Sequence, residues 1–144
     1  MGDVTVYDKA KWHFSGDYPE NLPEENAYTH GGIFLGWIVN NDMAAPGFLE
    51  DFKAEISQFR RREITPGRLM QIADGALVDD MMDDAGNAFA RAYFDFEHGK
   101  YLEDYEDVLG RGLPTLYHVE DSWANFDRMA SRIDERFAQW HASQ

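Results

Sequence analysis

The fold is decided by the stretch Tyr28-Thr29-His30-Gly31-Gly32-Ile33-Phe34-Leu35-Gly36-Trp37-Ile38-Val39, which is the longest nearly continuous apolar run in the chain. Every residue of 33–39 is apolar or glycine, so an element formed here must be enclosed by its neighbours. The run alone fits either a buried strand or a buried helix. Helix start signals at Pro23-Glu24-Glu25 and a stop signal at Asn40-Asn41 favour a central helix over about 23–41.

Further helices are predicted by apolar residues that recur at helical spacing on both sides of the central run. Thr65-Pro66 adds a capping residue followed by proline, which is typical of a helix start. The predicted segments are, in chain order, 46–62, 66–73, a single turn within 77–82, then 86–96, 101–110 and 123–140. We therefore predict a mainly α protein, a compact single-domain bundle of five to seven helices around a central apolar helix.

The N-terminal residues lack a lasting helical period but are rich in aromatic side chains. We predict an irregular, aromatic-rich N-terminal arm over 1–22, in which Val4-Thr5-Val6-Tyr7 forms a short extended piece. The helical core then covers 23–110. A C-terminal segment, 113–144, carries the amphipathic helix, and all 144 residues form one domain.

Composition narrows the class of protein. Hydrophobic residues make up 44% of the chain and charged residues 28%, which is typical of a globular domain. No run approaches the roughly 20 apolar residues of a membrane span, and the N-terminus lacks the pattern of an export signal. The absence of cysteine excludes disulfides, thiolate nucleophiles and cysteine-bound metals. We expect a soluble, cytoplasmic protein with no membrane contact.

The charge of the chain is strongly negative and unevenly placed. The formal net charge is -14, and residues 71–110 hold eleven acids and two bases, which gives -9. Such a surface repels nucleic acid and attracts basic partners. The sequence therefore favours a basic protein partner over a nucleic acid, although acidity that only maintains solubility is an equally open interpretation.

Two acidic clusters form the predicted partner-binding surface. Glu103 and Asp107 lie four residues apart, where like charges destabilise a helix unless a cation compensates them. A basic partner would supply that cation, and so would Arg91 or Arg111 of the same chain. A calcium loop is not favoured, because the alternating acids and central glycine of an EF-hand are missing. The predicted surface consists of Asp79, Asp80, Asp83, Asp84, Glu103, Asp104, Glu106 and Asp107.

The alternative function rests on the five histidines, His13, His30, His98, His118 and His141. Histidine beside carboxylates can bind a metal or transfer protons, so a metal-dependent or acid-base enzyme using His13, His30, His118 and nearby acids stays open. No paired-histidine motif, phosphate-binding loop or nucleophile elbow is present. We expect structural histidines, with no catalytic residue, no metal and no cofactor.

Several motifs together resemble a family of small acidic bacterial proteins catalogued as a domain of unknown function. They are Tyr7-Asp8-Lys9-Ala10-Lys11-Trp12-His13, Gly16-Asp17-Tyr18-Pro19, Leu22-Pro23-Glu24-Glu25, the 30–37 helix, Gly86-Asn87-Ala88-Phe89, Tyr101-Leu102-Glu103-Asp104-Tyr105 and Leu116-Tyr117-His118-Val119-Glu120-Asp121. The resemblance implies that the chain forms a compact single domain. It also implies that the chain is similar to immunity proteins. Our hypothesis is an immunity or inhibitor protein, not an enzyme, that neutralises a cognate bacterial toxin through the acidic surface. The oligomeric state stays open.

Overall fold

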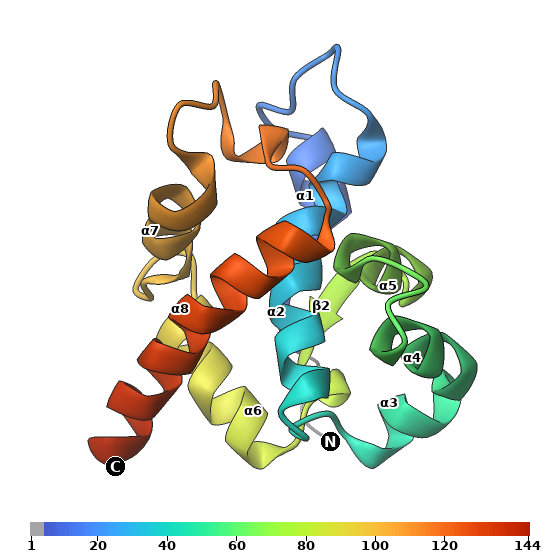
Figure 1. The fold of residues 1–144 in the computed structure, drawn as a ribbon, viewed down its shortest axis with the longest axis vertical. Helices are drawn as coiled ribbons and strands as arrows, with labels where there is room; N and C mark the ends of the chain where they lie inside the picture. The colour runs from blue at the N-terminus through green and yellow to red at the C-terminus, as the bar shows by residue number, and fades with distance from the viewer. Residues whose placement is uncertain (1–4) are drawn as a thin grey trace.

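Helix α2 (Thr29–Asn40) runs through the middle of the molecule, and the other elements pack around it (Figure 1). In the computed structural model, which describes residues 5–144, every residue of α2 from Thr29 to Val39 is buried. The helix continues from a 3-10 turn, η1 (Glu24–Tyr28), which begins directly after Pro23. The helix predicted over 23–41 is therefore present as η1 followed by α2.

The described residues form eight α-helices, one two-stranded sheet and several short 3-10 or π-helical turns, so the mainly α class is confirmed. Some predicted helices are divided into shorter ones, which is why we count more than five to seven. Besides η1 and α2, the elements are β1 (Val6–Lys9), α1 (Ala10–Phe14), α3 (Pro46–Asp51), α4 (Lys53–Arg60), α5 (Pro66–Ile72), β2 (Ala76–Val78), η2 (Asp79–Met81), α6 (Asp84–Phe89), η3 (Ala90–Phe94), α7 (Tyr101–Tyr105), η4 (Glu106–Gly110), η5 (Leu116–His118) and α8 (Trp123–Ala142).

The helices begin where capping chemistry predicts them but are interrupted by packing. The side chain of Thr65 accepts a hydrogen bond from the Arg68 backbone nitrogen at the start of α5, as expected for an N-cap. The predicted 46–62 helix breaks at Phe52, whose backbone (φ -119°, ψ 30°) leaves the helical region. The predicted 86–96 and 101–110 helices pass into the π-helical turns η3 and η4.

The two-stranded sheet is the main departure from the sequence prediction. Strands β1 and β2 pair antiparallel, with Val6 opposite Val78 and Asp8 opposite Leu77, and the register shifts between Val6 and Asp8. The single turn predicted within 77–82 is present as the 3-10 turn η2, whereas the strand β2 that precedes it was not predicted. The predicted irregular arm contains β1 and α1, and its residues 1–4 lie outside the described part of the chain.

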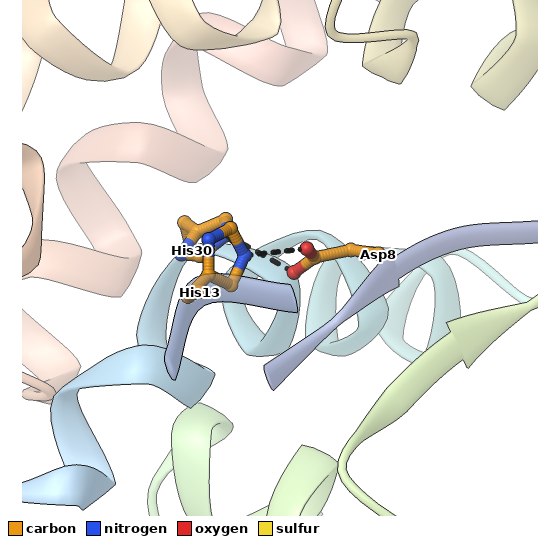
Figure 2. A group of neighbouring side chains, drawn as sticks. All are labelled: Asp8, His13 and His30. Carbon is orange, nitrogen blue, oxygen red and sulfur yellow. Dashed lines mark hydrogen bonds and ion pairs between the residues drawn. The ribbon is translucent and has the colours of Figure 1, made fainter. Parts of the chain in front are cut away.

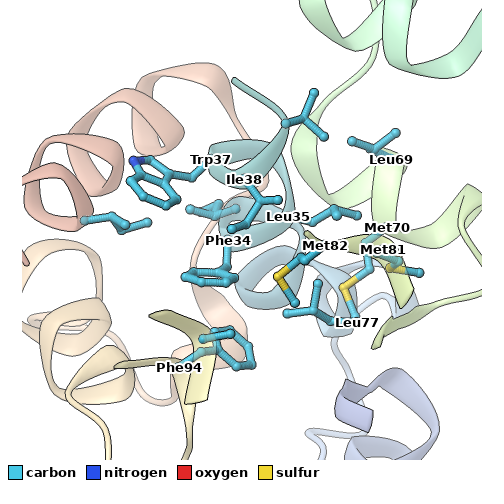
Figure 3. Packing of buried hydrophobic residues seen from close by; sticks show 14 of the residues in the cluster. Phe34, Leu35, Trp37, Ile38, Leu69, Met70, Leu77, Met81, Met82 and Phe94 are labelled. Carbon is cyan, nitrogen blue, oxygen red and sulfur yellow. The ribbon is translucent and has the colours of Figure 1, made fainter. Parts of the chain in front are cut away.

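One hydrophobic core connects all layers of the molecule. Figure 3 shows Phe34, Leu35, Trp37 and Ile38 of α2 among side chains of α5, β2 and η3. Helix α8 covers another side of the core and buries Phe126, Met129 and Ile133. Across residues 5–144, no helix has both the length and the apolar character that a membrane span requires.

Candidate metal centre

Asp8, His13 and His30 converge beside the first turn of α2 (Figure 2). His13 Nε2 lies 2.7 Å from Asp8 Oδ1, and His30 Nε2 lies 3.0 Å from Asp8 Oδ2. The two Nε2 atoms are 3.0 Å apart, and the imidazole rings stand nearly perpendicular at 82°. The three side chains come from β1, α1 and α2, so the cluster fixes the N-terminal segment against the central helix.

Local backbone features place each member of the cluster. The bulge in β1 directs Asp8, the one fully buried position of that strand, toward α2. Gly31 leaves room for it, since a Cβ there would come within 2.9 Å of Asp8 Oδ2. On the other side of α2, the Tyr101 hydroxyl donates a 2.6 Å hydrogen bond to the His30 carbonyl oxygen.

One buried oxygen of this cluster lacks a hydrogen-bond donor. Asp8 is 0% exposed, yet its Oδ2 has no hydrogen-bond partner among the described residues. His30 Nε2 is close enough, but this nitrogen is directed at His13 Nε2 instead. An unpaired oxygen on a fully buried carboxylate is unfavourable. A cation or a hydrogen-bond donor at this site would therefore pair the Oδ2 atom.

The surroundings hold Asp8 in its ionised form. Burial by itself raises the pKa of Asp8, but the neighbouring imidazoles of His30 and His13 outweigh it and hold the pKa well below its usual range. The cluster therefore offers a carboxylate and two imidazoles at one point, which is a donor set that divalent transition metals prefer.

Tyr117 extends the cluster from the far end of the sequence. Its hydroxyl oxygen lies 2.6 Å from His13 Nδ1. Burial and the negative charges of Asp8 and Asp17 raise the pKa of Tyr117, so its hydroxyl keeps its proton. A histidine that binds a metal through Nε2 usually donates its Nδ1 proton to a neighbouring acceptor. The Tyr117 oxygen is placed to be that acceptor.

A cavity of about 230 Å³ lies against the two imidazole rings. Besides His13 and His30 it is lined by Tyr117 and by three apolar side chains, Phe96, Leu102 and Leu116. His13 and His30 therefore belong to the cluster and also line the cavity beside it.

The cluster contains only part of the histidine site considered from sequence. His13 and His30 meet, whereas His118 Nδ1 lies 2.9 Å from the hydroxyl oxygen of Thr115. His98 is exposed near Asp95. Sequence reasoning missed Asp8 and Tyr117, because neither stands at a helical spacing from a histidine. The Asp8 to His13 interval of five residues could have indicated a contact only if the strand-to-helix junction had been recognised.

The predicted acidic surface is divided by the structure. Asp104 is 2% exposed and bonds to Arg132, Arg136 and the Tyr93 hydroxyl. Asp107 bonds to Arg132 and Arg111. Arginines of the same chain therefore compensate both acids, and the partner-binding role of this surface stays a prediction.

The remaining predicted acids have mixed surroundings. Asp83 caps α6, where its Oδ1 accepts a 2.8 Å hydrogen bond from the Gly86 backbone nitrogen. Asp79 is half-buried, and the exposed acids of the predicted surface are Asp80, Asp84, Glu103 and Glu106. The exposed set is thus four carboxylates instead of eight.

Comparison with known proteins gives a family but no activity. The chain belongs to the family described as a domain of unknown function (DUF7832), which matches residues 6–119. The match includes Asp8, His13, His30 and Tyr117 and ends before α8. No curated protein and no solved structure matches the chain.

Proposed function

We propose that this protein binds a divalent transition-metal ion, of the class of zinc, through Asp8, His13 and His30. The observation that carries the proposal is the unpaired Oδ2 of the fully buried Asp8. A cation bound by this oxygen and the two Nε2 atoms would satisfy all three donors at once. Protons on the two imidazoles would pair Oδ2 less well, because His30 Nε2 lies 3.0 Å from Oδ2 but is directed at His13 Nε2.

The separations of the donor atoms support such a centre. Metal–ligand distances near 2.0 to 2.2 Å in tetrahedral geometry place the donors about 3.3 to 3.6 Å apart. His30 Nε2 lies 3.0 Å from both Asp8 Oδ2 and His13 Nε2, and His13 Nε2 lies 2.7 Å from the other oxygen of Asp8, Oδ1. The three side chains therefore need to move apart by about 0.3 to 0.9 Å to admit the ion.

A proton relay is the competing interpretation of the same geometry. His13 could donate from Nε2 to Asp8 Oδ1 and accept from the Tyr117 hydroxyl at Nδ1, since the distances are 2.7 and 2.6 Å. That arrangement joins Asp8, His13 and Tyr117, while His30 Nε2 stays 3.0 Å from Asp8 Oδ2 without being directed at it. The metal accounts for all four groups, so it is the better explanation.

Three protein ligands leave a coordination position for water, as in catalytic zinc sites. Structural sites are instead closed by a fourth protein ligand. We therefore propose a metal-dependent enzyme as the functional class, in place of the non-enzymatic role expected from sequence. In this proposal Asp8, His13 and His30 bind the ion, and Tyr117 orients His13.

Zinc titration of the metal-free protein tests the proposal. We expect one zinc ion per chain by calorimetry and elemental analysis. Asp8→Asn, His13→Gln and His30→Gln should each weaken binding at least about 100-fold, because each removes a ligand or its charge. His118→Gln is the matched control and should bind zinc as the wild type does. A wild-type protein that binds neither zinc nor cobalt at micromolar concentration would contradict the proposal.

The toxin-neutralising role is a second proposal, supported by a different observation. Glu103 and Glu106 are both exposed on the α7–η4 segment, where a basic protein could reach them. The natural candidate is the product of a neighbouring gene. If the proposal holds, Glu103→Lys with Glu106→Lys weakens that complex at least about 10-fold and reduces its salt dependence. Unchanged affinity would exclude this surface.

A further inference from the structure

We infer that the cavity beside Asp8, His13 and His30 is a ligand pocket for a small carboxylate with an apolar body. The inference rests on the proposed function, because His13 and His30, two of the proposed metal ligands, line the cavity. It goes beyond metal binding by naming the chemistry of the molecule that the site accepts.

The walls and the volume of the cavity specify the apolar body. Phe96, Leu102 and Leu116 offer only carbon atoms to an occupant. A closed apolar cavity of about 150 Å³ binds benzene. A volume of about 230 Å³ therefore suits one ring with a short substituent, roughly six to eight carbon atoms. Larger drug-like molecules need pockets of about 300 Å³ or more.

The charge of the occupied centre specifies the head group. A divalent cation held by one carboxylate and two neutral imidazoles has a net charge of +1, and the adjoining walls are apolar. An anionic oxygen ligand neutralises this charge at the open coordination position. A carboxylate is the smallest common organic group that supplies it.

Tyr117 adds a second contact for the same head group. When His13 binds a metal through Nε2, its Nδ1 carries the proton and donates it to the Tyr117 oxygen. The phenol proton of Tyr117 is then free to be donated to another acceptor. Because Tyr117 also lines the cavity, a carboxylate there can accept this hydrogen bond.

The test compares phenylacetate with acetate on the zinc-loaded protein by calorimetry. The two ligands share a head group, so their difference reports the apolar body alone. We expect phenylacetate to bind at least about 10-fold more tightly, because its ring leaves water for the cavity. Equal affinities would overturn the inference.

Cavity-filling variants show whether the ring occupies this space. Leu116→Trp should abolish the preference for phenylacetate, and Leu102→Trp provides a second variant that fills the cavity from α7. Leu113→Trp is the control, since Leu113 is 39% exposed and lies outside the lining. Circular dichroism should show that both cavity-filling variants are folded. If both still bind phenylacetate more tightly than acetate, the inference is overturned.

Metal content separates the two proposals. If zinc binds but phenylacetate shows no preference over acetate, the pocket is wrong and the metal centre stands. If the wild-type protein binds no metal, both are wrong.

Discussion

Asp8 combines features that rarely coexist without a ligand. It is fully buried and ionised, and one of its oxygens has no hydrogen-bond donor among the described residues. Leaving such an atom unpaired costs about 1 to 3 kcal/mol or more. A side chain that only stabilised the fold would be expected to have both oxygens paired. A cation bound by this oxygen would compensate the cost.

Tyr117 is expected to act on the metal through His13. Tyr117→Phe removes the oxygen 2.6 Å from His13 Nδ1 while keeping the ring. Loss of such an outer partner usually weakens metal affinity by about 10- to 100-fold, and we predict a zinc affinity about 10-fold lower. Competition with a chromophoric chelator measures it.

Tyr18→Phe is the matched control, because Tyr18 packs against Tyr117 but hydrogen-bonds to the Pro23 carbonyl oxygen instead of a histidine. Its zinc affinity should equal that of the wild type. An unchanged affinity in Tyr117→Phe would show that His13 is oriented without the tyrosine.

Asp104 gives the folded state an acid-sensitive ion cluster. Burial raises the pKa of Asp104, but hydrogen bonds from Arg136, Tyr93 and Arg132 outweigh it and leave the pKa below the ordinary 3.8. A carboxyl with a depressed folded-state pKa stabilises the fold at pH values above its unfolded pKa. This contribution is therefore complete above about pH 5 and is lost as the pH falls below 3.8.

We predict that Asp104→Asn lowers the free energy of unfolding by about 2 to 4 kcal/mol at pH 7, because two arginines lose their partner. The same variant should lose less stability than the wild type when the pH falls from 5 to 3. Urea unfolding at several pH values measures both effects. Glu103→Gln removes an equal charge from an exposed position and should change little; a large effect there would show that net charge is responsible.

His13 and His30 could be selected from sequence by residue type, whereas Asp8 could not. A histidine is a candidate ligand wherever it occurs, but aspartate is common on surfaces, and this chain has many acids. What distinguishes Asp8 is its burial, which depends on the bulge in β1 and the space beside Gly31. Both are properties of three-dimensional packing.

The crossing of α2 and α5 depends on Gly32. A Cβ at this position would lie 2.8 Å from the Gly67 Cα, closer than real Cβ atoms approach backbone. We predict that Gly32→Ala lowers the free energy of unfolding by about 2 kcal/mol or more, because two helices must separate. Thermal or urea denaturation measures the change.

Gly47→Ala is the matched control for this crossing. Gly47 lies in the first turn of α3 and has no atom within 4 Å of an added Cβ. This change should be neutral or should stabilise the protein by up to about 1 kcal/mol. Equal destabilisation in both variants would show that helical glycine itself, and not the crossing, is responsible.

Helices were predictable from sequence where a single apolar face or a single capping residue determines their position. Helices α5 and α8 begin at capping residues that the sequence displays, Thr65 and Ser122. Strand β2 was not predictable, because three residues, Ala76–Val78, become a strand only through pairing with β1, about 70 positions earlier. The break at Phe52 likewise depends on packing, since the rings of Phe48 and Phe52 pack with centroids 5.1 Å apart and planes tilted by 41°.

The molecule carries a large excess of negative charge. Against 27 acids the chain has 13 arginines and lysines, and several of these are already paired with acids. Mutual repulsion of the remaining carboxylates destabilises the compact state, and salt screens it. We predict that raising sodium chloride from 10 to 300 mM increases the melting temperature by roughly 4 °C, equivalent to about 1 kcal/mol.

Calorimetry of the metal-free protein at neutral pH measures this change. Choline chloride at the same ionic strength should act equally, because screening does not depend on which cation is present. A melting temperature that falls with salt would show that the internal ion pairs dominate over repulsion.

The position of the three ligands has a mechanical consequence. All lie within the first 30 residues, yet they belong to a strand, a short helix and the central helix. An ion held among them would cross-link the N-terminal segment to the interior, as a disulfide does in chains that contain cysteine. Chelation should therefore expose α1 to trypsin, which cleaves after Lys11, and to chymotrypsin, which cleaves after Trp12 and Phe14, while α8 stays resistant. The time course of cleavage would report the release of this segment.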